Sequence, residues 1–179
     1  MIKRIFDFTS AFFGLIILSP LLIIVSIIIK MTSRGAVFYK QERTGRNAEI
    51  FTIIKFRSMV ENHGDDNTVT VSGDQRITKF GAFIRKYKID ELPGLWNVFQ
   101  GEMSLVGPRP DLPYYYSLLK GEDRKILELR PGITGPASLK YANEEQILKL
   151  QDNPEKYHYD VIFKDKVKIN LAYYYKNNL

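Results

Sequence analysis

The sequence predicts an α+β fold, a mostly helical small domain with a short β-hairpin that follows an N-terminal membrane helix. Three observations carry this prediction. Residues 11–29 form an uncharged run of nineteen residues, which is long enough for a membrane helix. Two short apolar runs flank a polar turn at Thr44-Gly45, which is typical of a hairpin. Apolar residues recur at helical spacing in later segments.

Length and composition limit the class of protein. The chain has 179 residues, which predicts one compact domain with a short extra element. Its net charge of +6 favours polyanionic partners such as phosphates, anionic lipids or nucleic acids. Because there is no cysteine, disulfides, thiolate zinc sites and cysteine nucleophiles are excluded. His63 and His158 lack metal-ligand spacing, and we expect both at the surface or in turns.

The apolar run at residues 11–29 would form a helix about 28 Å long, which only just spans a hydrocarbon core. Pro20 stands in its middle and predicts a bend or break, because proline lacks the amide proton of a helical residue. The hydroxyl of Ser19 can bond a carbonyl that is freed in the preceding turn. The sequence therefore predicts a membrane helix broken at Ser19-Pro20.

Basic residues flank the apolar run on both sides, which favours a cytoplasmic location for both ends. They are Lys3 and Arg4 before the run, and Lys30, Arg34, Lys40, Arg43 and Arg46 after it. A re-entrant helix that enters and leaves one leaflet satisfies both flanks, and we expect this arrangement. The alternative is a single tilted span with a proline kink. We expect residues 1–34 to form the membrane element and residues 35–179 the cytoplasmic domain at the membrane interface.

The cytoplasmic part begins with the hairpin, whose predicted strands are Val37–Tyr39 and Ile50–Phe56. Residues 62–73 are rich in Asp, Asn, Gly and Ser, so they should form a surface loop. Asp65 and Asp66 in this loop could hold a cation, although adjacent loop acids are more often simply solvated.

The later segments predict helices. Arg76–Lys88 has five basic residues and no acid, and its apolar residues recur as Phe80, Phe83, Ile84 and Tyr87. This interfacial amphipathic helix either packs one face on the core or lies among lipid headgroups, and the two can coexist. A second helix should begin near Asp90 as its N-cap and end at Gly101. Further helices are expected at residues 118–129 and 144–150, separated by the structured loop RPGITGP.

The stretch from Arg85 to Asp111 combines adjacent carboxylates with arginines. Asp90 and Glu91 could simply cap a helix and favour its positive end. Alternatively, at a helix start, one carboxylate can face a substrate while the other binds Mg²⁺. The prolines around Arg109 would hold its guanidinium on a stiff support that suits two phosphate oxygens. A surface turn with a solvated arginine is the other interpretation.

Several segments of the sequence resemble those of a known family. DELPGLWNVFQGEMSLVGPRP resembles the signature of the bacterial sugar transferases, the monotopic phosphoglycosyl transferases. FYKQERTGRNAEIFTIIKFRSM, RPGITG and Ser19-Pro20 agree with further family segments in order. Gly94 departs from the pattern, where a larger polar residue is usual, and so does Pro136-Ala137. Family members continue past the equivalent of Leu179 into a last amphipathic helix, so we expect that helix to be truncated here.

The resemblance implies a reaction. A sugar-1-phosphate would pass from a UDP-sugar to polyprenyl (undecaprenyl) phosphate, with release of UMP, in the first membrane step of glycoconjugate or exopolysaccharide synthesis. Asp90 would be the nucleophile that carries a covalent phosphosugar, which predicts ping-pong kinetics. Glu91, together with Asp90, would serve Mg²⁺, while Arg85 and Arg109 would contact phosphate.

Other implied features are less specific. Lys55, Arg57, Arg130 and Thr134 are candidate phosphate or nucleotide contacts. The expected location is the cytoplasmic face of the bacterial inner membrane, with the lipid bilayer and downstream glycosyltransferases as partners. The main alternative is a noncatalytic membrane-anchored basic adaptor. Nucleic-acid binding is disfavoured because no zinc-finger, homeodomain or RNA-binding motif occurs. No Walker A or dinucleotide fingerprint occurs either.

Overall fold

The computed structural model describes residues 2–60, 71 and 73–177, and it confirms the predicted α+β fold. The α-helices are α1 (Ile2–Thr32), α2 (Lys79–Lys86), α3 (Leu95–Gln100), α4 (Pro113–Ser117), α5 (Pro136–Lys140), α6 (Glu144–Lys149), α7 (Pro154–Tyr157) and α8 (Lys164–Asn177). The strands are β1 (Phe38–Thr44), β2 (Ile50–Phe56), β3 (Ser104–Val106) and β4 (Gly132–Thr134). Short 3₁₀ segments η1 (Arg46–Ala48), η2 (Ile89–Gly94) and η3 (Gly121–Glu128), and a π-helical turn η4 (His158–Phe163), complete the described elements.

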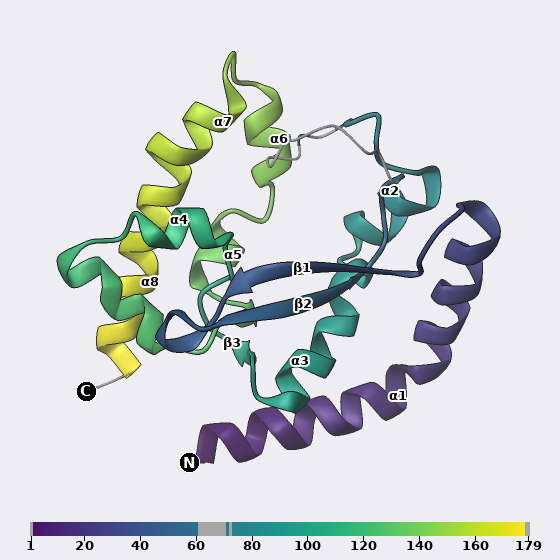
Figure 1. Cartoon of the computed structure of the whole chain (residues 1–179), viewed down its shortest axis with the longest axis horizontal. Helices are drawn as coiled ribbons and strands as arrows, with labels where there is room; N and C mark the ends of the chain where they lie inside the picture. The colour runs from purple at the N-terminus through teal and green to yellow at the C-terminus, as the bar shows by residue number, and fades with distance from the viewer. Residues whose placement is uncertain (1, 61–70, 72, 178–179) are drawn as a thin grey trace.

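The β1–β2 hairpin crosses the middle of the molecule, with α1 and α3 below and to its right, α2 above its right-hand end, and the C-terminal helices to its left and above (Figure 1). Two of the hydrophobic clusters join the hairpin to α1, α2 and α3. A third cluster, which includes Tyr115, Ile126, Phe163 and Val167, lies among α4, η3 and α8. The hairpin therefore separates the membrane helix from the C-terminal helices.

The hairpin prediction is confirmed, although the first strand is longer than Val37–Tyr39. Residues 38–44 all pair with β2 in antiparallel register, from Phe38 opposite Phe56 to Thr44 opposite Ile50. The added residues are mostly polar and lie on an open two-stranded ribbon, so they leave no apolar signal in the sequence.

Helix α1 runs without interruption through Pro20 and bends along its length (Figure 1), so the helix is not broken at Ser19-Pro20 as predicted. The Ser19 hydroxyl donates to the carbonyl of Ile16 at 2.8 Å, as predicted for the turn before the proline. Before the bend, Ala11 is buried beside α3 and β2; after it, Val25 and Ile29 pack on Phe56 and Ile84. The membrane helix therefore shares its core with the rest of the chain, and a division at residue 34 stays a prediction.

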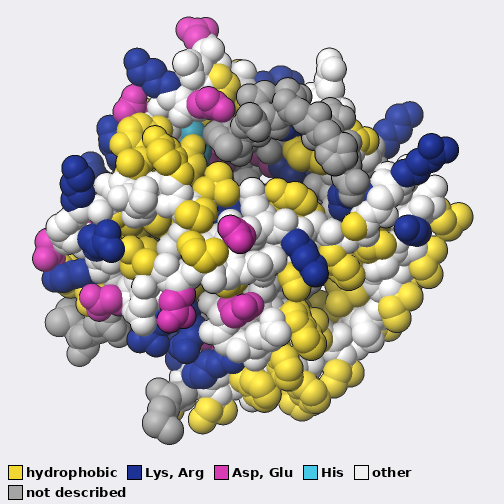
Figure 2. Space-filling model, viewed as in Figure 1, with side chains coloured by type: hydrophobic (Ala, Val, Ile, Leu, Met, Phe, Trp, Pro, Cys, Tyr) yellow, Lys and Arg dark blue, Asp and Glu magenta, His cyan; other side chains and the backbone are white. Residues whose placement is uncertain are grey.

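The opposite face of α1 is apolar and exposed. Within the described residues, α1 is the one helix long and apolar enough to cross a membrane, and only 11% of its most apolar window is buried. Figure 2 shows hydrophobic side chains gathered along the lower right edge of the molecule, where α1 lies in Figure 1. A helix with this exposure needs an apolar environment on that side.

Helix α2 begins at Lys79, three residues later than Arg76, because the Thr78 side chain caps it by accepting the amide proton of Gly81 at 2.8 Å. Ile84 is buried, and Phe80 packs against the same cluster. Phe83 and Tyr87 are exposed. The helix thus packs one apolar side on the core, as one interpretation predicted, and presents two aromatic rings outward. Its location among lipid headgroups stays a prediction.

Several predictions were wrong. Residues 118–129 do not form one α-helix, because Gly121 adopts φ +54° and 3₁₀ structure follows it. The RPGITGP segment is not only loop, since β4 pairs in parallel with β3. His158 is buried, not at the surface, and its Nε2 lies 3.2 Å from Glu144 Oε1. The predicted α6 is confirmed. His63, Asp65 and Asp66 lie outside the described residues.

Candidate active site

Asp90 lies in η2, at the start of the segment that continues into α3. The prediction that Asp90 caps this helix was wrong, because the N-cap position is Lys88, in the left-handed region, and no side chain caps the turn. Only 6% of Asp90 is exposed, and its Oδ1 has no hydrogen-bond partner among the described residues. Burial and the neighbouring charge of Glu91 raise the pKa of the Asp90 carboxyl. This carboxylate is thus buried without being used as a cap.

Glu91 lies between two cations that come from other parts of the chain. Lys55 of β2 donates to its Oε1 at 3.0 Å, and Arg109 donates to both of its oxygens, at 3.0 Å on Oε2. Burial raises the pKa of Glu91, but Arg109 and Lys55 outweigh it and hold the pKa well below its usual range. Glu91 therefore stays ionised and joins β2 to the segment that carries Arg109.

The same arrangement lowers the pKa of Lys55. Burial and the repulsion of Arg109 lower the pKa of Lys55 to about 8, against the attraction of Glu91. Of its side chain, 18% is exposed. The site thus contains a lysine that changes charge in a mildly alkaline solution.

Asn97 of α3 fixes the distance between β2 and the Asp90 segment. It is completely buried, and its amide side chain accepts from the Ile54 amide at 3.1 Å and donates to the Thr52 carbonyl at 2.8 Å. It also donates to Glu102 at 2.7 Å. One side chain thereby satisfies two backbone groups of β2, next to Lys55.

Arg109 follows β3 in the segment Gly107-Pro108-Arg109-Pro110, and the RPGITG segment holds this backbone. Gly107 donates its amide to Thr134 at 2.9 Å, and Gly132 donates to Pro108 at 2.7 Å. A Cβ at Gly107 would lie 2.3 Å from a neighbouring backbone oxygen, so only glycine permits this approach. The predicted stiff support for Arg109 is therefore a pair of backbones in close contact.

Two residues that the sequence analysis did not assign complete the support. The Tyr116 hydroxyl donates to the Arg109 carbonyl at 2.8 Å. Arg43 of β1 donates to the Pro110 carbonyl at 3.4 Å and lies 3.9 Å from Asp111. No local pattern identifies either residue, because both reach the site through tertiary contacts.

Arg85 lies in the last turn of α2, on the Asp90 side of the site. Its charge acts to lower the pKa of Asp90, although burial outweighs it. Its Nη1 donates weakly to the Ser58 hydroxyl at 3.4 Å, and its Nη2 pairs with Glu145 of α6. The structure therefore gathers Lys55, Arg85 and Arg109 around the Asp90-Glu91 pair.

The remaining candidates make contacts elsewhere. Arg57 donates to the Ser33 carbonyl at 3.0 Å and to the Arg34 carbonyl, so it ties β2 to the end of α1. Arg130 donates to the Gly101 carbonyl at 2.9 Å, just after α3. Thr134 contributes its backbone carbonyl to Gly107, and its side chain is exposed. Their assignment as nucleotide contacts stays a prediction.

The chemistry of the two carboxylates suits Mg²⁺. This ion is usually held by one or two carboxylates, with phosphate oxygens and water completing its shell. In the described part of the chain Asp90 has a buried oxygen without a partner, and the ionised Glu91 beside it accepts hydrogen bonds from Lys55 and Arg109 on its two oxygens. Within the described residues no group of three or more His, Cys, Asp or Glu could hold a metal. A diphosphate would therefore have to supply further ligands.

Comparisons with known proteins agree on one family. A family model described as bacterial sugar transferase matches residues 1–177. The chain is 41% identical over 155 residues to "Undecaprenyl-phosphate glucose phosphotransferase" of Komagataeibacter xylinus, covering 82% of this chain and 29% of that protein. It is 39% identical over 143 residues to "Uncharacterized sugar transferase EpsL" of Bacillus subtilis, covering 80% and 70%.

A further relative is named for a different sugar. The chain is 39% identical over 144 residues to "UDP-N-acetylgalactosamine-undecaprenyl-phosphate N-acetylgalactosaminephosphotransferase" of Aeromonas hydrophila, covering 77% of this chain and 34% of that protein. The chain thus spans about a third or less of the two longer relatives. Since the family model covers nearly the whole chain, this protein belongs to the bacterial sugar transferase family.

Proposed function

We propose that this protein is a phosphoglycosyl transferase, which moves a sugar-1-phosphate from a UDP-sugar to undecaprenyl phosphate and releases UMP. Family membership and the names of the relatives support the general reaction. The observation that carries the detailed proposal is the buried Asp90 carboxylate, which has an oxygen without a partner among the described residues. The charges of Lys55 and Arg85 act on it, and Arg109 holds the neighbouring Glu91. A carboxylate in such surroundings is suited to nucleophilic attack on phosphorus.

The reaction proceeds in two displacements. In the first, an Asp90 oxygen forms a bond to the sugar-bearing phosphorus of the donor, and the bond from that phosphorus to the UMP oxygen breaks. In the second, the phosphate oxygen of the acceptor attacks the same phosphorus and the Asp90 carboxylate leaves. The product is an undecaprenyl diphosphate sugar, and each step conserves the phosphoryl group.

The cations of the site make the first displacement feasible. An anionic carboxylate and a diphosphate repel each other unless positive charge lies between them. Arg109 and Lys55 supply this charge next to Glu91, and Arg85 supplies it on the other side. Asp90 and Glu91 would hold Mg²⁺, which would neutralise the diphosphate and polarise the bond to UMP.

The membrane elements give the reaction its location. The exposed apolar face of α1 and the outward rings of Phe83 and Tyr87 are suited to lipid. We infer a monotopic enzyme on the cytoplasmic face of the bacterial inner membrane. Helix α1 would enter the cytoplasmic leaflet and return to the same side. The acceptor phosphate at the headgroup level could then reach Asp90, and glycosyltransferases that extend a lipid-linked sugar would consume the product.

The first test replaces the nucleophile. Asp90→Asn should abolish UMP release from UDP-sugars while the protein still fractionates with membranes, because the change removes one charge without altering shape. Asp152→Asn is the matched control, since Asp152 is exposed and lies in the segment between α6 and α7. Undiminished UMP release by Asp90→Asn would remove the proposed nucleophile. If the wild-type protein itself releases no UMP from any donor, the membrane-anchored adaptor becomes the better description.

The second test detects the intermediate. Mass spectrometry of the wild-type protein incubated with donor and Mg²⁺, but without acceptor, should show a mass increase of one phosphosugar on the peptide that contains Asp90. Addition of undecaprenyl phosphate should remove this mass. Because the relatives are named for different sugars, the donor is found by screening UDP-sugars for UMP release.

A further inference from the structure

Two adjacent acidic residues at the start of α6 face the candidate active site from the C-terminal half of the chain. Glu144 accepts from Lys166 at 2.8 and 2.6 Å and lies 3.2 Å from His158. Both partners are nearly buried, with 8% and 9% of their side chains exposed. Glu144 therefore fixes the start of α6 on α8 and the preceding π-helical turn.

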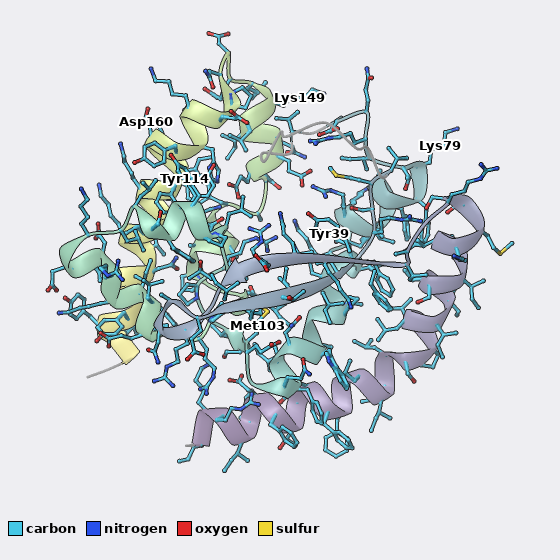
Figure 3. All side chains as sticks on the ribbon, viewed as in Figure 1. Tyr39, Lys79, Met103, Tyr114, Lys149 and Asp160 are labelled. Atoms are coloured by element: carbon cyan, nitrogen blue, oxygen red, sulfur yellow. The ribbon has the colours of Figure 1, made fainter. Side chains whose placement is uncertain are left out.

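Glu144 also affects the site electrostatically. Burial lowers the pKa of Arg109, but Glu91, Asp111 and Glu144 together raise it above its usual value. The first turn of α6 is thus within Coulombic reach of the site. Figure 3 labels Lys149, at the far end of the same short helix, which lies above the β1–β2 hairpin in this view.

The next residue, Glu145, contacts the site directly. Its Oε1 pairs with Nη2 of Arg85. This is the one ion pair of Arg85 among the described residues. The other hydrogen bond of the guanidinium is the weak one to Ser58 at 3.4 Å, and its Nε is buried without a hydrogen-bond partner in the described part of the chain. Arg85 therefore retains donors that its neighbours among the described residues do not use.

The two members of this pair differ in exposure. Of the Glu145 side chain 38% is exposed, against 21% of Arg85. An ion pair of this kind contributes little net stability. The carboxylate is stabilised by water nearly as well as by the guanidinium, so little is gained when the pair forms. A phosphate offers more acceptor oxygens in the geometry of a guanidinium fork. An incoming phosphate can therefore replace Glu145 at small cost, while Glu144 keeps the helix in place.

We propose that Glu145 is an internal substitute for substrate phosphate: it neutralises Arg85 in the donor-free enzyme and is displaced when the donor diphosphate binds. This inference rests on the proposed function, in which Arg85 contacts phosphate. Glu145 thereby sets the affinity for the donor, because every binding event has to break its pair with Arg85. Removing its charge should strengthen donor binding.

The expected size of the effect on donor binding follows from the exposure of the Arg85–Glu145 pair. Exposed ion pairs contribute up to about 1 kcal/mol, which corresponds to about fivefold in an equilibrium constant. Glu145→Gln should therefore lower the donor KM two- to fivefold, and raise kcat/KM by the same factor. The dissociation constant of UDP with Mg²⁺, measured by calorimetry, should fall in parallel. The gain should shrink as salt is added, since salt already screens the pair.

Two variants serve as controls. Glu155→Gln makes the same charge change at an exposed position on α7 and should leave the UDP dissociation constant unchanged. In an Arg85→Ala background, Glu145→Gln should no longer change UDP binding, because the partner of the carboxylate is absent. The UDP readout does not need turnover, so this comparison holds even if Arg85→Ala is inactive.

The outcomes separate this inference from the proposed function. An unchanged or higher UDP dissociation constant in Glu145→Gln overturns it, and so does an equal gain in Glu155→Gln. A lower kcat/KM would also overturn it, because Glu145 would then be orienting Arg85 for the reaction. Failure of the proposed function would appear elsewhere, as undiminished UMP release by Asp90→Asn.

Discussion

Raising the pH from 7 to 9 should reduce the donor kcat/KM for UMP release about tenfold, because Lys55 loses its proton in this interval. Burial and the charges of Arg109 and Arg43 lower the pKa of Lys55 to about 8, and Glu91 compensates only in part. With that pKa, about nine tenths of the lysine is charged at pH 7 and about one tenth at pH 9. Because kcat/KM reports the free enzyme, it should follow this fraction.

The stability of the protein should not fall with the activity. In the unfolded chain a lysine keeps its proton to about pH 10.4. Between pH 8 and that value the unfolded state binds more protons at this residue than the folded state. The contribution of Lys55 to the free energy of unfolding therefore rises with pH in this window. A melting temperature that stays level or rises while UMP release falls would separate titration of the site from unfolding.

The assay measures single-turnover UMP release with donor and Mg²⁺ but no acceptor, so that ionisation of the acceptor phosphate does not contribute. Lys55→Arg is the matched variant, since a guanidinium keeps its charge across the range. Its residual activity should show no loss between pH 7 and 9. If wild type and Lys55→Arg decline in parallel, the alkaline loss does not come from Lys55. A flat wild-type profile would refute the argument from burial.

Further predictions test the support of the site and the membrane arrangement. Asn97→Ala should cost about 3 kcal/mol, from three hydrogen bonds of about 1 kcal/mol each, and lower the melting temperature by about 6–12 °C; a loss under about 1 kcal/mol would contradict its role in holding β2. Gly107→Ala should abolish activity because its Cβ would clash with backbone, whereas Gly94→Ala, with nothing closer than 4.0 Å, should be tolerated; equal activities would refute this. Cysteines introduced in place of Lys3 and Lys40 should both react with an impermeant reagent from the cytoplasmic side, and opposite accessibility would indicate a transmembrane span.

The sequence predicted those parts of the fold whose signals are local. The proline in an apolar run, the turn at Thr44-Gly45 and the glycine after α3 each determine nearby backbone, and the structure has a bend, a hairpin and a helix end there. It did not predict the β3–β4 pair or the burial of His158. Both depend on segments that are distant in sequence, and three-residue strands carry no periodicity.

The candidate site divides in the same way. Asp90, Glu91 and Arg109 lie in one continuous motif, and the structure brings Lys55 of β2 and Arg109 to Glu91. The roles assigned to these residues stay predictions. The capping interpretation of Asp90 was wrong because Lys88 turns the chain earlier, which no propensity of lysine indicates. Arg43 and Glu145 were missed because each reaches the site through a tertiary contact.

The sharing of one core between α1 and the catalytic elements has a practical consequence for handling this protein. Deleting α1 to obtain a water-soluble version would expose Phe51, Phe56 and Ile84, which are buried in clusters that include residues of α1. Folding of the rest of the chain should consequently depend on α1. On the proposed function, this shared core fixes the position of Asp90 relative to α1, which a flexible linker would not do.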